Sequence, residues 1–244
     1  MAKKVVSLIL AGGRGKRMEV LCDLWPKPVL PLGGSVRVID FSLSNCVYSR
    51  IADIGVLVDY ERERLADYLI GWNAVNGAPR VRILPPVADS YAGTADAVYQ
   101  NLDYLEKRGA DTVLILSGDH VYKMDYRPMI AFHQNMRADA TLAVFRVPIE
   151  ETHRFGTVMT DAAGRIKEFK EKSSIARSNL VSMGIYIFNR DALARRLGED
   201  AGEAGSLHDF GYNVLPRMIK TDRVFAYEFK GYWLDIGTVK AYYE

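Results

Sequence analysis

The chain has 244 residues, 49% of them hydrophobic, which is enough to bury the core of one large α/β domain and excludes a disordered protein. Its 32 basic and 30 acidic side chains give a net charge of +2, a balance that argues against nucleic acid or an acidic membrane surface as a partner. Apolar runs fall short of the roughly 18 residues of a membrane span, and two cysteines without a CxxC pattern, Cys22 and Cys46, predict reduced thiols in a cytoplasmic protein.

The first predicted element is a strand that leads into a glycine-rich turn. Residues 5–10 are aliphatic on both faces, as expected of a strand buried in a parallel sheet. Glycines without a Cβ let main-chain N–H groups approach an anion, and nearby cations add positive charge. The glycines are Gly12, Gly13 and Gly15, and the cations are Arg14, Lys16, Arg17 and Lys27. The turn is therefore predicted to hold phosphate groups.

Two common glycine motifs do not fit this turn. A Walker loop would need a glycine at Leu10 and a Ser or Thr at Arg17. A dinucleotide fingerprint would need a third glycine at Met18. Taken alone, the stretch could also be an ordinary glycine turn with surface cations.

Strand-like and helix-like segments alternate along the rest of the chain. Helices are predicted to end near 49 and to cover 61–72, 94–107 and 128–137. Strands are predicted at 54–58, 81–84, 111–116, 140–147 and 180–188, with a hairpin over 156–172 and a loop over 199–205. This alternation predicts one α/β domain over 1–244, with a Rossmann-like, twisted, mostly parallel sheet and helices on both faces.

The predicted strand at 111–116 ends in Ser117-Gly118-Asp119-His120. In open α/β sheets, ligands gather outside the carboxyl ends of the strands. An acidic residue at that edge can hold a metal, so Asp119 is a candidate ligand. The alternative is that Asp119 only caps the turn that follows the strand.

Ordered motifs from Leu8 to Glu244 resemble the sugar-phosphate nucleotidylyltransferases and, among them, the glucose-1-phosphate adenylyltransferases. The motifs are, in chain order, AGGRGKRM, KPVLPLGG, RVIDFSLSNC, GTADAVYQN, SGDHVYKMDY, SMGIYIF, HDFG and GYWLDIGTVKAYYE. The resemblance implies that ATP and glucose 1-phosphate react to ADP-glucose and pyrophosphate in the cytoplasm, with Mg²⁺, as the activating step of glycogen or starch synthesis. It also implies the nucleotide-diphospho-sugar transferase fold.

This reaction suits the chemistry of its nucleophile. A sugar phosphate has a second pKa of about 6, so its oxygen is already ionised near neutral pH and needs no general base. Catalysis then depends on positioning and charge neutralisation, which require cations and a metal. We therefore expect the four histidines, His120 included, to be structural.

The resemblance assigns roles residue by residue. Arg17 and Lys27 would be catalytic cations on the leaving pyrophosphate, and Asp119 and Asp235 would be catalytic carboxylates that hold Mg²⁺. The nucleotide would contact Leu10, Ala11, Gly12, Gly13, Gly15, Tyr91, Gly93 and Thr94. The sugar phosphate would contact Glu171, Lys172, Ser182, Gly184 and Trp233, with Glu171 on sugar hydroxyls and Lys172 on the phosphate.

Simpler interpretations remain for several of these residues. Asp235 could pair with Lys240, Lys172 could be a solvated hairpin cation, and Tyr91 and Trp233 could be core aromatics. The sequence also departs from the family at Leu234, where an arginine usually precedes the second aspartate. The loss of that charge puts phosphate affinity in doubt.

Two further functions stay open beside adenylyl transfer. One is a uridylyl- or thymidylyltransferase, because phosphate and metal groups do not select the base. The other is a catalytically silent regulatory subunit that binds nucleotide sugars. GTADAVYQN and HDFG favour adenylyl transfer. The family's left-handed β-helix domain, where effectors and subunits of a homotetramer meet, is expected to be absent from residues 1–244.

Overall fold

The computed structural model describes residues 3–13, 18, 21–22, 25–76, 80–175 and 177–243. The first predicted strand is confirmed as β1 (Val5–Leu10), which is buried at the centre of the main sheet. β1 pairs in parallel with β4 (Asp53–Leu57) on one edge and with β6 (Thr112–Ser117) on the other, and β5 (Arg80–Leu84) pairs in parallel with β4. β1, β4 and β6 are mostly apolar and buried, as expected of parallel strands whose two faces are both covered by helices.

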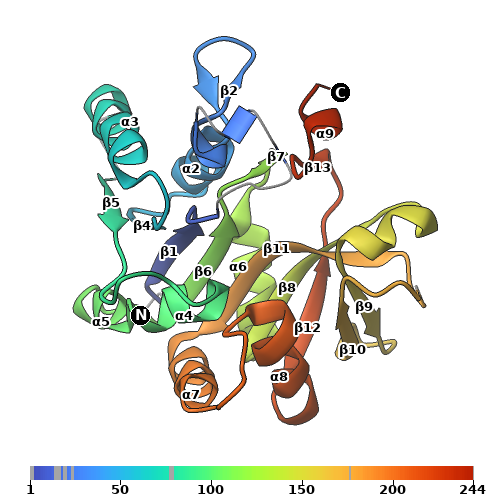
Figure 1. The fold of residues 1–244 in the computed structure, drawn as a ribbon. Helices are drawn as coiled ribbons and strands as arrows, with labels where there is room; N and C mark the ends of the chain where they lie inside the picture. The colour runs from blue at the N-terminus through green and yellow to red at the C-terminus, as the bar shows by residue number, and fades with distance from the viewer. Residues whose placement is uncertain are drawn as a thin grey trace.

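The second half of the sheet is mixed. β11 (Leu180–Asn189) runs antiparallel to β6 on one edge and to β8 (Ala140–Arg146) on the other, and β12 (Val224–Glu228) extends β8 in parallel. A hairpin of β9 (Gly156–Thr160) and β10 (Ile166–Glu171) joins β11 through β9. Within the described residues the sheet has nine strands, and all but β10 and β11 point in the direction of β1 (Figure 1). The predicted α/β fold is confirmed.

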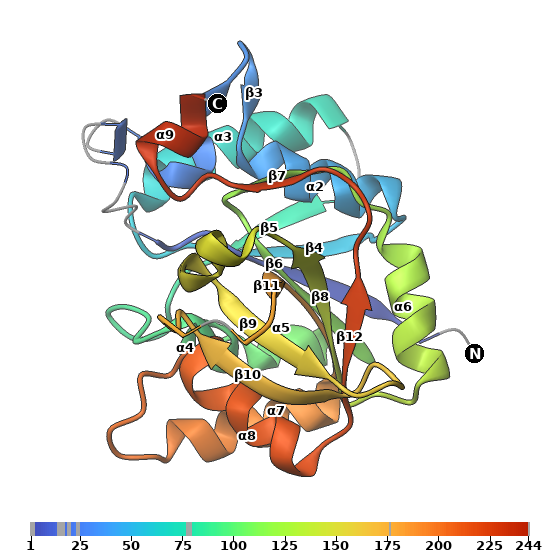
Figure 2. The same cartoon turned by 90° about the vertical axis from the view of Figure 1, so that its right-hand side faces the viewer.

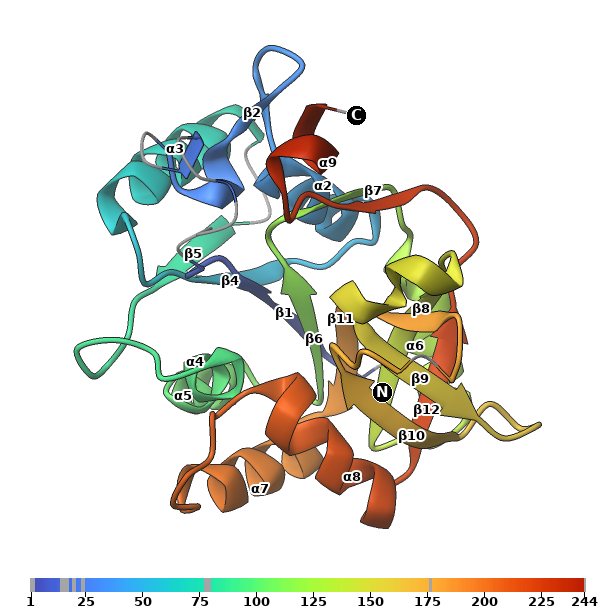
Figure 3. The ribbon, with the colours of Figure 1, turned by 45° about the vertical axis from the view of Figure 1, so that its right-hand side comes forward.

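Alternate side chains of the central strands feed two hydrophobic layers. Ile9 and Leu116 pack with the helices of one face, and Leu8 and Ile115 pack with those of the other. The first face is covered by α2 (Ile39–Tyr48), α3 (Arg62–Asn76) and α6 (Tyr126–Asn135). The second face is covered by α4 (Thr94–Tyr99), α5 (Leu102–Lys107), α7 (Arg190–Ala201) and α8 (Leu215–Thr221). Figure 3 shows α2 and α3 on one side of the sheet and α4, α5, α7 and α8 on the other.

Two predicted segments were wrong in detail. The single helix expected over 94–107 is two helices, because the Asn101 amide donates to the Ala97 carbonyl at 2.9 Å and its backbone leaves the helical region. The loop expected over 199–205 begins inside α7. Asp200 is buried there and accepts hydrogen bonds from the Ser206 hydroxyl at 2.7 Å and from His208 Nδ1 at 3.0 Å. These tertiary contacts stabilise a polar last turn.

A two-stranded ribbon ties the end of the chain to the end of β6. It pairs β7 (His120–Tyr122) with β13 (Trp233–Asp235) in antiparallel register, before the short helix α9 (Val239–Tyr243). Figure 2 shows this C-terminal segment running across the molecule alongside β7. A smaller ribbon joins β2 (Pro31–Leu32) to β3 (Val36–Arg37). Among the described helices, none combines the length and apolar character that a membrane span requires.

Candidate active site

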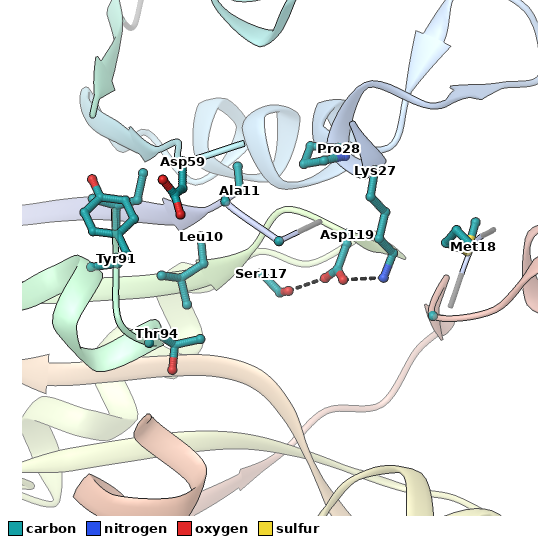
Figure 4. Close-up of a pocket in the computed structure, with 16 residues that line it drawn as sticks. Leu10, Ala11, Met18, Lys27, Pro28, Asp59, Tyr91, Thr94, Ser117 and Asp119 are labelled. Atoms are coloured by element: carbon teal, nitrogen blue, oxygen red, sulfur yellow. Dashed lines mark hydrogen bonds and ion pairs between the residues drawn. The ribbon is translucent and has the colours of Figure 1, made fainter. Parts of the chain in front are cut away.

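A cavity of about 470 Å³ lies at the carboxyl ends of β1, β4 and β6. Every described member of the predicted nucleotide set lines it: Leu10, Ala11, Gly12, Gly13, Tyr91, Gly93 and Thr94. Lys27 and Asp119 line the same cavity, and Figure 4 shows them at one end with Tyr91 and Thr94 at the other. Gly15 and Arg17 lie outside the described residues. The predicted phosphate turn and the predicted metal edge therefore meet in one cavity.

Gly93 stands where two chain segments approach each other too closely for a side chain. A Cβ at this position would lie 2.3 Å from the carbonyl oxygen of His208 and 2.4 Å from that of Leu207. The His208 carbonyl also accepts hydrogen bonds from the N–H groups of Ala95 and Asp96 at the start of α4, at 2.8 and 3.2 Å. The turn that contains the HDFG motif thus packs directly against this wall of the cavity.

The polar groups of Tyr91 and Thr94 are engaged within the protein. The Tyr91 hydroxyl donates to the Leu84 carbonyl at 2.9 Å, and burial raises its pKa to about 12, so the phenol stays neutral. The Thr94 hydroxyl donates to Asp209 at 2.9 Å and accepts from the Phe210 N–H at 3.1 Å. Both residues therefore form the wall of the cavity.

Asp119 and Asp235 are brought together by the ribbon of β7 and β13, in which Asp235 lies opposite His120. Lys27, in the 3₁₀ turn η2 (Lys27–Val29), is buried beside them. Its ammonium forms an ion pair with Asp119 and lies 3.9 Å from Asp235 Oδ1. The two carboxylates that the resemblance assigned to Mg²⁺ and the lysine that it assigned to pyrophosphate therefore form one charged cluster.

His120 belongs to this cluster, although the sequence led us to expect a structural histidine. Its Nε2 lies 3.5 Å from Asp119 Oδ1 and 3.7 Å from Asp235 Oδ1. Ligand atoms of the three residues lie within 4.8 Å of one another, an arrangement that could hold a metal ion. His120 Nδ1 is buried and, among the described residues, has no hydrogen-bond partner. The sequence could have indicated that His120 lies in this cluster, because His120 directly follows Asp119.

The cluster keeps the Asp119 carboxyl ionised. Burial alone would raise its pKa, but the charges of Lys27 and His120 and hydrogen bonds from Lys27 and Ser117 outweigh burial and hold the pKa well below the usual range. An ionised carboxylate is the form that binds a cation. Two carboxylates and an imidazole are a donor set that fits a divalent metal.

Glu171 ends β10 and Lys172 follows it, and neither is among the residues that line this cavity. Lys172 Nζ is 3.3 Å from Glu171 Oε1 and 6.0 Å from the ring centre of Tyr212. Burial raises the pKa of Glu171, and the charge of Lys172 opposes that rise. A Cβ on Gly211, in the HDFG turn, would lie 2.5 Å from Glu171 Oε2, so this carboxylate packs against the same turn as Gly93.

Two of the other three predicted sugar-phosphate residues, Gly184 and Trp233, lie near His120, and Ser182 contacts Gly184. Gly184 has a positive φ of 67°, and a Cβ there would lie 3.4 Å from His120 Cε1. The Ser182 hydroxyl accepts from the Gly184 N–H at 3.2 Å. The Trp233 ring is buried, with its centre 5.5 Å from that of His120 and 5.3 Å from that of Phe155. Trp233 therefore packs as a core aromatic that supports the cluster.

The structure also adds two charged residues that the sequence analysis missed. Asp59 follows β4, lines the cavity beside Gly12 and lies 3.5 Å from Arg62. A carboxylate directly after a parallel strand is the signal that pointed to Asp119, and it could have identified Asp59. Arg154 lies 3.8 Å from Asp235 Oδ2, and only the tertiary fold brings them together.

Comparison with known proteins agrees with this geometry. The family model described as nucleotidyl transferase matches residues 6–244. Glucose-1-phosphate adenylyltransferases of Thermotoga neapolitana, Pseudothermotoga lettingae and Clostridium acetobutylicum are 48%, 49% and 45% identical to the chain over 98%, 99% and 99% of its length. The matched part covers 59%, 60% and 66% of those proteins, so the chain spans about three-fifths of the length of the first two.

Proposed function

This chain belongs to the nucleotidyl transferase family, and we propose that it transfers the adenylyl group of ATP to glucose 1-phosphate, giving ADP-glucose and pyrophosphate. The observation that carries the proposal is that Gly12 and Gly13, which follow β1, line one cavity together with Lys27 and Asp119, and that these two residues form a cluster with Asp235. The choice of ATP and glucose 1-phosphate rests on the relatives that carry those substrates in their name.

In the proposed reaction, an ionised oxygen of glucose 1-phosphate bonds to the α-phosphorus of ATP. The bond from that phosphorus to the oxygen shared with the β-phosphorus breaks, and its electron pair leaves on pyrophosphate. No proton has to be removed from the nucleophile, because its second pKa is about 6. The protein therefore has to align the two phosphates and offset the charge that grows on pyrophosphate.

One group of described residues would bind the triphosphate, and another would bind the sugar phosphate. The triphosphate would lie along Ala11, Gly12 and Gly13, which line the cavity, with the Lys27 ammonium on the leaving group. Glu171 and Lys172 would bind the hydroxyls and the phosphate of the sugar. The catalytic role of Arg17 remains a prediction, because this residue lies outside the described part.

We propose Mg²⁺ as the cofactor, held by Asp119 and Asp235, whose ligand atoms lie close to each other and to His120. When bound, it would neutralise negative charge on phosphate oxygens. The Lys27 ammonium already contacts both carboxylates, so it would offset their charge and remain close to the phosphates. We further propose that the enzyme acts in the cytoplasm and that it forms a homotetramer when a C-terminal β-helix domain is present.

A pyrophosphate-release assay tests the function. The chain is mixed with ATP, UTP, dTTP or GTP, each crossed with glucose, mannose and galactose 1-phosphate. Release with ATP and glucose 1-phosphate, at a rate well above all other pairs, is expected. A preference for UTP or dTTP would contradict adenylyl transfer. Binding of both substrates without release would identify a silent regulatory subunit.

A further inference from the structure

Arg154 is a cation at the site for which neither the sequence analysis nor the proposed mechanism provides a role. It ends the 3₁₀ segment η3 (Ile149–Arg154), directly before β9, and its side chain is 27% exposed. Its guanidinium nitrogen lies 3.8 Å from Asp235 Oδ2, while Asp235 Oδ1 faces Lys27 and His120. Asp235 therefore lies between Arg154 on one side and Lys27 and His120 on the other, with one oxygen facing each side.

The backbone next to Arg154 leads to the residue predicted to hold the sugar phosphate. The Phe155 carbonyl accepts a hydrogen bond from the Lys172 N–H at 3.0 Å. The Phe155 ring lies 5.3 Å from the Trp233 ring, which precedes Asp235 by two residues on β13. Arg154 thus lies on the segment that bridges Lys172 and Asp235.

The side chain is held in place but keeps capacity to bind an anion. Its guanidinium carbon lies 5.2 Å from the Phe155 ring centre, a cation–π distance, and a terminal nitrogen lies 3.8 Å from Glu151. Both ion-pair distances, to Glu151 and to Asp235, exceed hydrogen-bond length. Within the described part of the chain, N–H donors of this guanidinium therefore remain available to a ligand.

We propose that Arg154 is a second cation for the phosphate of the sugar 1-phosphate, acting beside Lys172. The proposal rests on the proposed function and deepens it. A phosphate dianion that enters next to Asp235 and Glu171 meets two carboxylates, and a second cation beside Lys172 would offset their repulsion. A guanidinium suits this task because its planar array of donors matches two phosphate oxygens at once.

The test compares four variants of the chain by calorimetric titration with glucose 1-phosphate in the presence of Mg²⁺. Arg154→Gln should raise the dissociation constant at least about tenfold, as should Lys172→Gln, and Arg154→Lys should recover part of the loss. Arg146→Gln is the matched control, because Arg146 pairs with Glu228 on β12 through a contact of 2.9 Å and the same charge is removed.

A second readout separates phosphate binding from support of Asp235. Mn²⁺ affinity, followed by electron paramagnetic resonance without substrates, should stay within about threefold of wild type in Arg154→Gln. A fall in Mn²⁺ affinity with unchanged sugar-phosphate affinity would overturn the proposal, because Arg154 would then act through Asp235. Equal losses in Arg154→Gln and Arg146→Gln would also overturn it.

The experiment distinguishes this proposal from the proposed function. A wild-type chain that releases no pyrophosphate from ATP and glucose 1-phosphate contradicts adenylyl transfer, whatever Arg154 does. The titrations are then repeated with mannose, galactose and glucosamine 1-phosphate and with inorganic phosphate, which share the anion. If Arg154→Gln weakens binding of none of these probes tenfold, the role of Arg154 is overturned.

Discussion

Asp235 shows how one side chain connects two parts of the site. One of its oxygens faces Lys27 and His120, and the other faces Arg154. Asp119 is held by Lys27 and Ser117, and those contacts keep it ionised. Because the carboxylates approach each other closely, a divalent cation between them would relieve their repulsion. We therefore expect metal binding to require both Asp119 and Asp235.

We predict that Asp119→Asn and Asp235→Asn each lower turnover by at least about 10²-fold, because each removes half of the negative charge that holds the metal. Mn²⁺ affinity measured without substrates should fall in both variants, while the far-ultraviolet circular dichroism spectrum stays unchanged. Asp191→Asn is the control, since Asp191 is exposed on α7 and pairs with Arg190. Wild-type turnover of either variant at limiting Mg²⁺ would rule out the two-carboxylate site.

At the scale of elements, the walls of the cavity are set by close packing between distant segments. The HDFG turn packs against Gly93 on one side and places Gly211 against Glu171 on the other. It therefore contacts both the predicted nucleotide wall and the predicted sugar wall. Helix α6 has a different role, since it packs on the far side of the sheet through buried residues that include His133.

Gly93→Ala should disturb the nucleotide wall. Its Cβ would lie 2.3 Å from a backbone oxygen that cannot move without displacing the HDFG turn, so we expect a loss of roughly 1–3 kcal/mol in unfolding free energy and a higher KM for ATP. Urea unfolding and steady-state kinetics measure both effects. Gly71→Ala, in an open position of α3, should leave KM unchanged and stabilise the helix. Equal behaviour of the two variants would refute the close contact.

His133 gives the stability of the fold a defined pH dependence. Burial lowers its pKa to about 4, so the unfolded chain takes up a proton more readily than the folded one. The free energy of unfolding therefore keeps its full value above the ordinary histidine pKa of about 6.5. It falls by about 3 kcal/mol as the pH drops to 4. His133→Gln should flatten this part of the curve in urea unfolding at several pH values. His153→Gln, at an exposed site, should not, and an unchanged slope in His133→Gln would disprove the assignment.

The sequence was sufficient to predict the α/β class and the strands of the nine-stranded sheet except β12. Residues 5–10 are apolar except for Ser7, residues 113–116 are all apolar, and these stretches match buried β1 and β6 closely. β7 and β13 escaped prediction because strands of three residues leave no readable period. The polar end of α7 was read as a loop because Asp200 is stabilised by Ser206 and His208 across a turn.

The candidate site was predictable only in part, because tertiary contacts position several of its residues. Asp119 follows a strand and could be inferred from its position, whereas Asp235 was found through the family resemblance. The ribbon of β7 and β13 positions His120, and η3 positions Arg154. Both positions depend on tertiary contacts. Sequence patterns record which residues face the core, but they do not record which charged side chains converge on one point.

At the scale of the whole molecule, the site joins both ends of the chain. The cavity is built by β1, β4 and β6, and the C-terminal strand β13 brings in Asp235 through its pairing with β7. The predicted sugar-phosphate residues Glu171, Ser182 and Gly184 lie on β10 and β11, beyond β6 in the sheet. The proposed adenylyl transfer would require all three parts at once. The test that follows therefore uses the whole chain.

The most direct test follows the adenylyl group itself. ATP labelled at the α-phosphorus is incubated with glucose 1-phosphate, Mg²⁺ and the chain, and the products are identified by chromatography and mass spectrometry. The account predicts label in ADP-glucose, with one pyrophosphate released for each ADP-glucose formed, and loss of both products in Asp119→Asn and Asp235→Asn. Label that remains in ATP, or appears as AMP or ADP without ADP-glucose, would contradict it.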